Sequence, residues 1–451
     1  MNATETTTKK KRLSGILVHP TSFPSPYGIG DLGQGAYAFI DFLEKSGQHL
    51  WQVLPLGPTG FGDSPYQGFS AFAGQPLIIS PANLKELGLL SDADFADMPQ
   101  WDPKKIDYGA VLNFKTELFH KAYANFIHTP DKMLLEEFED FCLRQNFWLA
   151  DYALFMAAKD AHEGRCWLEW EPELKDPDDA SRKKWEKKLA EEIRYYQFLQ
   201  FLFFRQWDAL KEYANARSIE IIGDIPIFVS LDSVDVWAHK DLFQLDTKGY
   251  PTCVAGVPPD YFSATGQLWG NPLYDWKAHK NEDYAWWVAR VKHQIALTDY
   301  LRIDHFRGFE SYYSIPYGDL TAEFGHWEKG PDYDFFKTLK EKLGKKEVIA
   351  EDLGYLTPAV LKMVKKTGYP GMKVLQFAFD PREESDYLPH NYTRNSVVYT
   401  GTHDNQTTTA WVEEIGRADR AFAKQYLHVK RSKDVPEAMV RAALSSVSDT
   451  A

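Results

Sequence analysis

The chain has 451 residues, of which 44% are hydrophobic and 15% aromatic, and it carries a formal net charge of −13 at pH 7. This acidic balance argues against nucleic acid and anionic membrane surfaces as partners and suits a neutral substrate. Length alone suggests about three domains, but α/β barrels often run as long as this in a single domain.

The cysteines and the start of the chain bear on its location. Cys142, Cys166 and Cys253 are scattered and form no CxxC motif, which is typical of reduced thiols in a cytosolic protein. The first residues are polar, and no apolar signal-peptide core follows them. No apolar run is long enough to span a membrane. We therefore expect a cytoplasmic protein whose residues 1–12 form a disordered tail.

The first barrel elements are expected in residues 13–84. Two short apolar segments, at 15–20 and 50–56, are predicted to be strands. The second is followed by a loop rich in glycine and proline that carries Tyr66. Such a loop fits the wall of a binding site almost as well as it fits a plain surface loop, and both interpretations stay open.

Two insertions are expected around the third strand. Residues 85–218 show helical apolar spacing, and an aromatic stripe near their end is interpreted as core rather than as a ligand site. A third strand lies in 219–229 and brings Asp224 near its end. Residues 230–290 are irregular, which fits a lid over a barrel mouth.

The sequence around Asp304 is the strongest candidate for chemistry. Residues 300–306 are predicted to form a buried strand, so Arg302 and Asp304, two positions apart, share one face. A neighbouring guanidinium lowers the pKa of a carboxyl group, as a carboxylate nucleophile requires. A purely structural ion pair explains this stretch alone equally well.

Two later segments shift that balance. Glu351 follows a short apolar strand, and His403 and Asp404 follow another at 396–402. Three strands that each deliver a carboxylate at the C-terminal end predict one polar site on the top face of a parallel barrel.

The rest of 291–451 completes the expected elements. It supplies strands four to seven, the sixth at 371–377, and a helical stretch at 411–444. An eighth strand is not found, so we expect an incomplete barrel with two unpaired edges, poor stability and little activity.

The motifs resemble those of the 4-α-glucanotransferase family, also called amylomaltase or disproportionating enzyme, in the α-amylase clan. The resemblance runs from about Leu13 to the end of the chain. The motifs that carry it are His19-Pro20-Thr21-Ser22, Trp51-Gln52-Val53-Leu54-Pro55, Ser64-Pro65-Tyr66-Gln67, Gly223-Asp224-Ile225-Pro226, Arg302-Ile303-Asp304-His305-Phe306-Arg307-Gly308, Ala350-Glu351-Asp352-Leu353-Gly354 and Gly401-Thr402-His403-Asp404-Asn405.

The resemblance implies an α/β fold, a TIM (β/α)8 barrel with inserted helical subdomains. It implies transfer of a segment from an α-1,4-glucan donor to a sugar acceptor, without a cofactor. Asp304 would be the nucleophile, Glu351 the general acid/base and Asp404 the third acid. The implied substrate-binding residues are Tyr66, Asp224, Gln267, Trp269, Arg302, His305 and His403.

The implied chemistry makes demands on the two central acids. A retaining transfer needs them within roughly 5–5.5 Å of each other. Glu351 must hold a proton near neutral pH, so apolar surroundings that raise its pKa are expected. No metal is expected, because residues 227–229 read Ile-Phe-Val where the clan's calcium site has Asn-His.

Two alternatives stay open beside glucan transfer. An α-glucan hydrolase of the same clan would use the same acids, and Gln267 and Trp269, which match the family's lid loop, favour transfer. An inactive glucan-binding protein is disfavoured because all three acids are present, although the unseen eighth strand favours it.

Overall fold

The computed structural model describes residues 12–128, 131–260, 263–354 and 356–451. The expected disordered tail at 1–12 therefore lies outside the described residues except for its last member. Arg12 belongs to the fold, because its Nε donates a hydrogen bond to the carbonyl of Ser448 at 2.8 Å.

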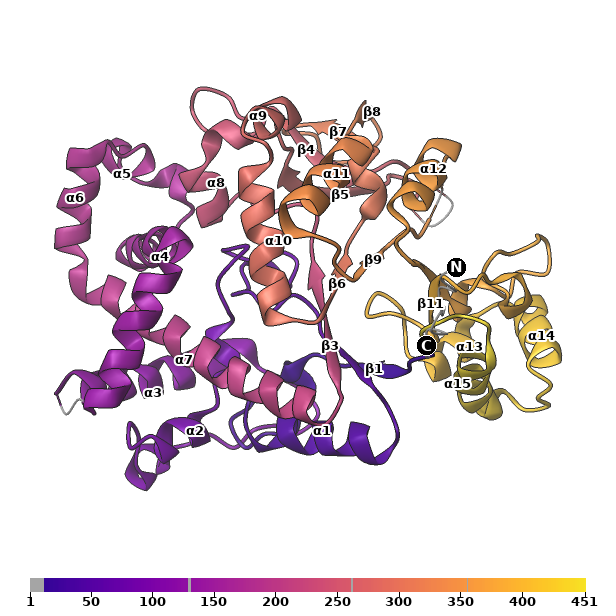
Figure 1. The fold of residues 1–451 in the computed structure, drawn as a ribbon, viewed down its shortest axis with the longest axis horizontal. Helices are drawn as coiled ribbons and strands as arrows, with labels where there is room; N and C mark the ends of the chain where they lie inside the picture. Colours follow the sequence, from indigo (N-terminus) through magenta and orange to yellow (C-terminus); the bar gives the residue numbers. More distant parts are fainter. Residues whose placement is uncertain (1–11, 129–130, 261–262, 355) are drawn as a thin grey trace, which may run out of the picture.

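A parallel sheet of seven strands forms the centre of the molecule (Figure 1). Its strands pair in chain order, and each lies inside a segment that the sequence predicts. They are shorter than predicted because the C-terminal part of each segment leaves the sheet. The strands are β1 (Gly15–Leu17), β2 (Leu50–Gln52), β3 (Glu220–Ile225), β6 (Tyr300–Ile303), β9 (Val348–Ala350), β10 (Gly371–Val374) and β11 (Ser396–Tyr399).

Both faces of this sheet are buried, as expected for parallel strands flanked by helices. Leu50, Ile222, Ile349, Met372 and Val397, each from a different strand, form one compact apolar cluster. A much larger cluster joins residues of the sheet to the helices packed around it. The apolar runs of the sequence are thus explained by burial on two sides.

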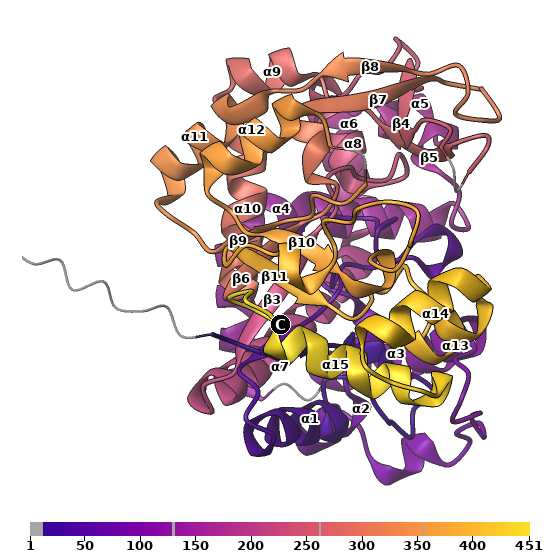
Figure 2. The same cartoon turned by 90° about the vertical axis from the view of Figure 1, so that its right-hand side faces the viewer.

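The predicted gap at the eighth position is partly filled, so the expectation that nothing pairs there is wrong. Thr450 forms parallel bridges with both Leu13 and Val397. The Val398 N–H donates to Thr450 at 3.0 Å, and the Gly15 N–H donates to Ala451 at 2.9 Å. The last residues of the chain therefore lie between the two outer strands (Figure 2). The sequence hid this because three residues are too few to show an alternating pattern.

The helices between 81 and 216 gather on one side of the sheet (Figure 1). The aromatic stripe is core as interpreted, since the side chains of Phe198, Phe203 and Trp207 are fully buried. The stretch from 181 to 216 lies in two helices, α6 and α7, which are separated at Leu189. The helices are α2 (Pro81–Glu86), α3 (Tyr108–His128), α4 (Lys132–Ala161), α5 (Pro172–Lys175), α6 (Asp179–Lys188) and α7 (Ala190–Ala216).

A second, antiparallel sheet was not predicted, and it corrects the reading of 230–290 as irregular. Its order is β5-β4-β7-β8. Two strands come from each side of β6 in the chain, and pairing between such distant segments leaves little local signal. The strands are β4 (Cys253–Val257), β5 (Gln267–Pro272), β7 (Ser311–Pro316) and β8 (His326–Lys329).

The remaining helices cover the central sheet and the C-terminal end. The stretch 411–444 is largely helical, as predicted, and forms three helices, interrupted at Gly416 and again before Val435. In the described chain, no helix is both long and apolar enough to span a bilayer. These helices are α1 (Gln34–Lys45), α8 (Val234–Ala238), α9 (Trp276–Asn281), α10 (Ala285–Leu297), α11 (Asp332–Leu343), α12 (Pro358–Thr367), α13 (Thr408–Glu414), α14 (Arg417–Tyr426) and α15 (Val435–Ser445).

Candidate active site

An ion-paired triad occupies the C-terminal ends of β3 and β6. Asp224 and Arg302 are register partners in the parallel sheet, so their side chains lie on the same face. Arg302 Nη1 lies 2.6 Å from Asp224 Oδ2, and its Nη2 lies 3.0 Å from Asp304 Oδ1. The predicted contact between Arg302 and Asp304 is therefore present, with a second carboxylate on the same guanidinium.

The pKa of Asp304 differs from the simple expectation. Burial raises the pKa of this carboxyl to about 8, and repulsion from Asp224, Glu351 and Asp404 acts in the same direction. Arg302 lowers the pKa, as expected, but its effect is smaller than that of burial. The expectation of a net lowered pKa is thus wrong, because the guanidinium is shared and the site collects several negative charges.

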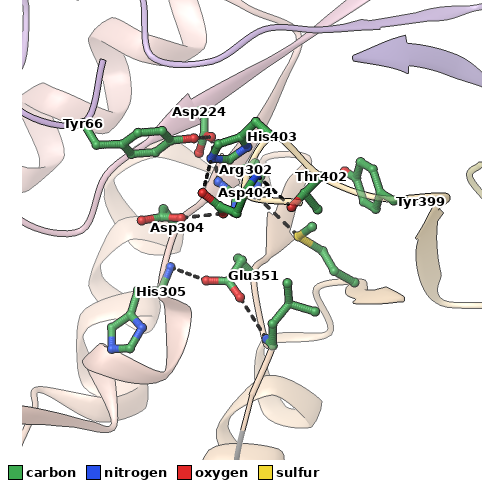
Figure 3. Close-up of polar contacts among 12 residues, drawn as sticks. Tyr66, Asp224, Arg302, Asp304, His305, Glu351, Tyr399, Thr402, His403 and Asp404 are labelled. Atoms are coloured by element: carbon green, nitrogen blue, oxygen red, sulfur yellow. Dashed lines mark hydrogen bonds and ion pairs between the residues drawn. The ribbon is translucent and has the colours of Figure 1, made fainter. Parts of the chain in front are cut away.

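Glu351 is held by main-chain groups on both of its oxygens. Its Oε2 accepts a hydrogen bond from the N–H of His305 at 2.7 Å, and its Oε1 accepts one from the N–H of Leu353 at 2.9 Å. The N–H of Glu351 itself donates to Ile303 at 3.0 Å, which ties the end of β9 to the end of β6. This pairing brings the carboxyl groups of Glu351 and Asp304 to the same edge of the sheet (Figure 3).

Tyr66 and the loop after β11 close the other side of the site. The Tyr66 hydroxyl donates to Asp224 Oδ2 at 2.7 Å, and its ring stacks on His403 with centroids 5.1 Å apart. His403 Nε2 lies 3.3 Å from Asp404 Oδ1. The Asp404 side chain is 75% exposed, so this acid stands at the open rim of the site, close to His403 (Figure 3).

The two predicted lid residues lie beside the site, next to His305. Trp269 Nε1 donates to Gln267 Oε1 at 3.0 Å, so the two side chains are joined by a hydrogen bond. Trp269 meets the His305 ring edge-on, with centroids 4.9 Å apart. Gln267 is exposed, and its side chain hydrogen-bonds to Trp269. The structure therefore brings eight of the ten predicted residues into one cluster and sets this pair beside it.

One positioning residue was missed. Gln376, which follows β10 and is 7% exposed, donates from Nε2 to the carbonyl of Gln406 at 3.0 Å. This bond fastens the loop that carries His403 and Asp404. A Cβ on Gly401 would lie 2.7 Å from Gln376 Nε2, so a larger residue there would displace this amide. The sequence showed only a polar residue at a strand end, a signal too weak to single it out.

The arrangement supplies the parts of an acid/base reaction on a neutral, hydroxyl-rich ligand. It has a carboxylate beside a guanidinium, a second carboxyl aligned by two N–H groups, and an orphan acceptor, since Asp224 Oδ1 is buried without a hydrogen-bond partner among the described residues. Across those same residues, no three His, Cys, Asp or Glu side chains gather in a metal-binding group.

Comparison with known protein families gives one clear match. The family model described as 4-alpha-glucanotransferase, glycoside hydrolase family 77, matches residues 18–451. Among curated relatives, the 4-alpha-glucanotransferase of Synechocystis sp. is 48% identical over 440 residues, which cover 97% of this chain and 87% of the relative. That of Thermus thermophilus is 46% identical over 443 residues, covering 97% and 88%.

Solved structures agree. The amylomaltase from Streptococcus agalactiae, solved in complex with acarbose, superposes with a TM-score of 0.94 at 41% identity, covering 98% of this chain and 89% of that one. The amylomaltase from Corynebacterium glutamicum has a TM-score of 0.74 at 19% identity and covers 97% and 60%. The second match speaks for the fold alone.

Proposed function

Because the chain belongs to the 4-alpha-glucanotransferase family and has its activity on α-1,4-glucans, we propose that it works by retaining double displacement on the site described above. The observation that carries the proposal is the pairing of β6 with β9, which sets Asp304 beside Arg302 and Glu351 on two N–H groups. Donor and acceptor are both α-glucans or their short oligosaccharides.

In the first step, an oxygen of Asp304 attacks the anomeric carbon of the donor. Glu351 gives its proton to the departing O4, so the glycosidic bond breaks as the ester to Asp304 forms. Arg302 stabilises the Asp304 carboxylate, because the guanidinium of Arg302 is buried and stays charged. The reducing-end segment of the donor leaves with the proton.

In the second step, the acceptor's 4-hydroxyl attacks the same carbon. Its proton goes to Glu351, now a base, while the electron pair of the ester bond returns to Asp304. The new α-1,4 bond has the original configuration, because two inversions have occurred. Water in place of the sugar would give hydrolysis.

The remaining residues are proposed to bind the donor ring. Asp224 and His403 offer an acceptor and a donor of hydrogen bonds, and the rim carboxylate of Asp404 is free to take sugar hydroxyls. Tyr66 presents a ring face for stacking once it parts from His403. The solved complex of the Streptococcus agalactiae amylomaltase with acarbose supports binding of a glucan-like ligand here.

The architecture around the site is part of the proposal. A complete (β/α)8 barrel with insertions at 85–218 and 230–290 is supported by the chain-order parallel pairing and by the bridges of Thr450. We propose that Gln267 and Trp269, on β5 in the second insertion, cover the acceptor. The free state of all three cysteines supports the expected cytoplasmic location.

Incubation with maltotriose tests the activity. Longer glucans together with glucose are expected from transfer. Glucose and maltose in equal amounts, without longer products, would show a hydrolase instead.

The mechanism is tested with a donor that needs no protonation to react. The Glu351→Gln variant, mixed with α-maltosyl fluoride, is expected to accumulate a maltosyl ester, which mass spectrometry of the digested protein should place on Asp304. An adduct on another residue, or none, would reject the proposed roles. Asp404→Asn is the matched comparison, since it leaves both reacting groups intact.

A further inference from the structure

His305 has a backbone conformation that is unusual for its residue type. It follows Asp304 directly, and its φ and ψ are 46° and 49°, in the left-handed region. Residues other than glycine adopt this region rarely, with histidine, asparagine and aspartate among the more tolerant. Persistent strain of this kind is held by the surrounding structure and gathers at functional sites.

The residues on both sides of His305 are fixed by the sheet. The Asp304 N–H donates to Ile225 at 3.0 Å, and the Phe306 N–H donates to the main-chain carbonyl of Glu351 at 3.0 Å. Between these two anchors, the left-handed turn directs the His305 N–H away from the sheet ladder. That N–H meets Glu351 Oε2 at 2.7 Å.

The imidazole of His305 does not touch Glu351, and its ring points the other way (Figure 3). It lies against the edge of Trp269, at 4.9 Å between centroids and 88° between planes. On its other side is Gly308, where a Cβ would sit 3.1 Å from His305 Cδ2. Its Nε2 is buried and lacks a hydrogen-bond partner among the described residues, so packing rather than polar contacts holds the ring.

We propose that His305 is a positioning residue that links Trp269 on β5 to the acid/base Glu351. Packing of the ring between Trp269 and Gly308 keeps residue 305 left-handed, and the left-handed backbone aims its N–H at Glu351 Oε2. Trp269 lies on β5, which pairs antiparallel with β4, and the two strands form a hairpin. The carboxyl plane of Glu351 is then set for proton transfer when this hairpin is in place. This inference rests on the acid/base role of Glu351 in the proposed function.

The link has a consequence for the choice between sugar and water. In the second step, Glu351 takes the proton of the acceptor hydroxyl as the ester bond to Asp304 breaks. If Glu351 is aligned only while Trp269 is packed on His305, this step is fastest when an acceptor fills the space beside the hairpin. Attack by water is accelerated less, because water makes no contact with the hairpin.

Three variants separate the backbone from the side chain. His305→Val disfavours the left-handed region strongly, because its side chain is β-branched. His305→Asn tolerates that region and keeps the N–H, but it loses the ring. Trp269→Leu removes the partner of the ring and leaves residue 305 unchanged. Glu351→Gln is the reference for a lost acid/base group.

The readout is chemical rescue, which a general loss of structure does not produce. α-Maltosyl fluoride forms the ester on Asp304 without an acid, and azide attacks the ester without a base, giving maltosyl azide and free Asp304 carboxylate. Maltotriose needs both proton transfers. A variant that misplaces Glu351 therefore fails with maltotriose and recovers with the fluoride and azide.

We expect His305→Val to lower kcat on maltotriose about 100-fold, within the range of a lost general acid/base. With fluoride and azide it should come within about fivefold of the parent, as Glu351→Gln should. His305→Asn should keep at least about ten times the kcat of His305→Val, and Trp269→Leu should show rescue of the same kind.

Other outcomes overturn the inference. An equal fall of kcat on maltotriose in His305→Asn and His305→Val would show that the backbone conformation is irrelevant. Loss in His305→Val without azide rescue, while Glu351→Gln is rescued, would reject positioning through Glu351 and leave the proposed function standing. Absence of rescue in Glu351→Gln itself would instead reject the proposed function. If His305→Val does not fold, as judged by its melting curve, the pair His305→Ala and His305→Gly makes the same comparison, with glycine expected to be faster.

Discussion

Asp224 on β3 and Arg302 on β6 are register partners, and Arg302 Nη1 lies 2.6 Å from Asp224 Oδ2. The same guanidinium holds Asp304 through its other terminal nitrogen at 3.0 Å. One cation therefore serves two carboxylates, the buried Asp224 and the partly exposed Asp304. Burial raises the pKa of Asp304 more than this shared guanidinium lowers it, and repulsion from Asp224 adds to the rise.

Replacing the nucleophile should abolish turnover. Asp304→Asn keeps the shape of the side chain and can still receive a hydrogen bond from Arg302, but it cannot form the ester. We expect kcat on maltotriose to fall below about a thousandth of the parent value, with binding of an unreactive oligosaccharide largely retained. Product analysis and calorimetric titration measure the two quantities.

The matched control for this change is Asp97→Asn, at an exposed position far from the site in the chain. It should leave both quantities as in the parent. Retention of more than about a thousandth of kcat in Asp304→Asn, in a preparation free of parent protein, would contradict the assignment.

The acid limb of the pH profile should respond to Asp224. The limb of kcat/KM reports ionisation of Asp304 in the free enzyme. Asp224 raises the pKa of Asp304 by repulsion. It also takes part of the charge of Arg302, the residue that lowers the pKa of Asp304. Asp224→Asn removes both effects, so kcat/KM should fall in size and its acid limb should move to lower pH. A limb that stays in place or moves up would contradict this reading.

The sequence predicts most of this site because the acids sit at strand ends. Asp224, Asp304 and Glu351 each follow an apolar run, and in a parallel sheet such ends converge. The pKa of Asp304 was not predictable in the same way, because it depends on burial and on three other acids brought near by tertiary structure. Gln376 was missed for the related reason that its partners are main-chain atoms of a distant loop.

The fold shows the same division. All seven strands of the central sheet are visible as apolar segments, since burial on both faces leaves a continuous signal. The sheet β5-β4-β7-β8 was not visible, because β4 and β7 pair across more than 50 residues of intervening chain. The pairing of Thr450 with Leu13 and Val397 depends on closure of the whole sheet, and its local sequence gives no sign of it.

Activity should not depend on a divalent metal. The residues proposed for catalysis form hydrogen bonds and ion pairs with one another, and each proton transfer is assigned to Glu351. Dialysis against EDTA should leave kcat and melting temperature within experimental error of the untreated protein. A loss that calcium restores would show that a metal site supports the fold or the reaction.

The charge of Asp304 should cost stability at high pH. In the unfolded chain an aspartate has a pKa of about 4, whereas in the fold burial raises it to about 8. The folded protein thus binds more protons than the unfolded chain between these values, so its stability falls as pH rises through that window. Asp304→Asn should melt at the parent temperature near pH 4 and above it at pH 8. An equal difference at both pH values would contradict the raised pKa.

The last three residues should stabilise the whole sheet. Asp449, Thr450 and Ala451 form five main-chain hydrogen bonds, to Leu13, Gly15, Arg394 and Val398. At about 1 kcal/mol each, and less at a chain end, deletion of 449–451 should cost about 2 kcal/mol or more. It would also expose the outer edges of β1 and β11 to other chains, so light scattering on heating should begin at a lower temperature than in the parent.

The control is Asp449→Ala, which keeps the main chain and removes only a carboxylate 3.9 Å from Arg394. Its melting temperature should therefore equal that of the parent. If the truncated protein has the melting temperature of the parent as well, the strand pairing of Thr450 contributes nothing to stability, and the two outer strands are held by their other neighbours alone.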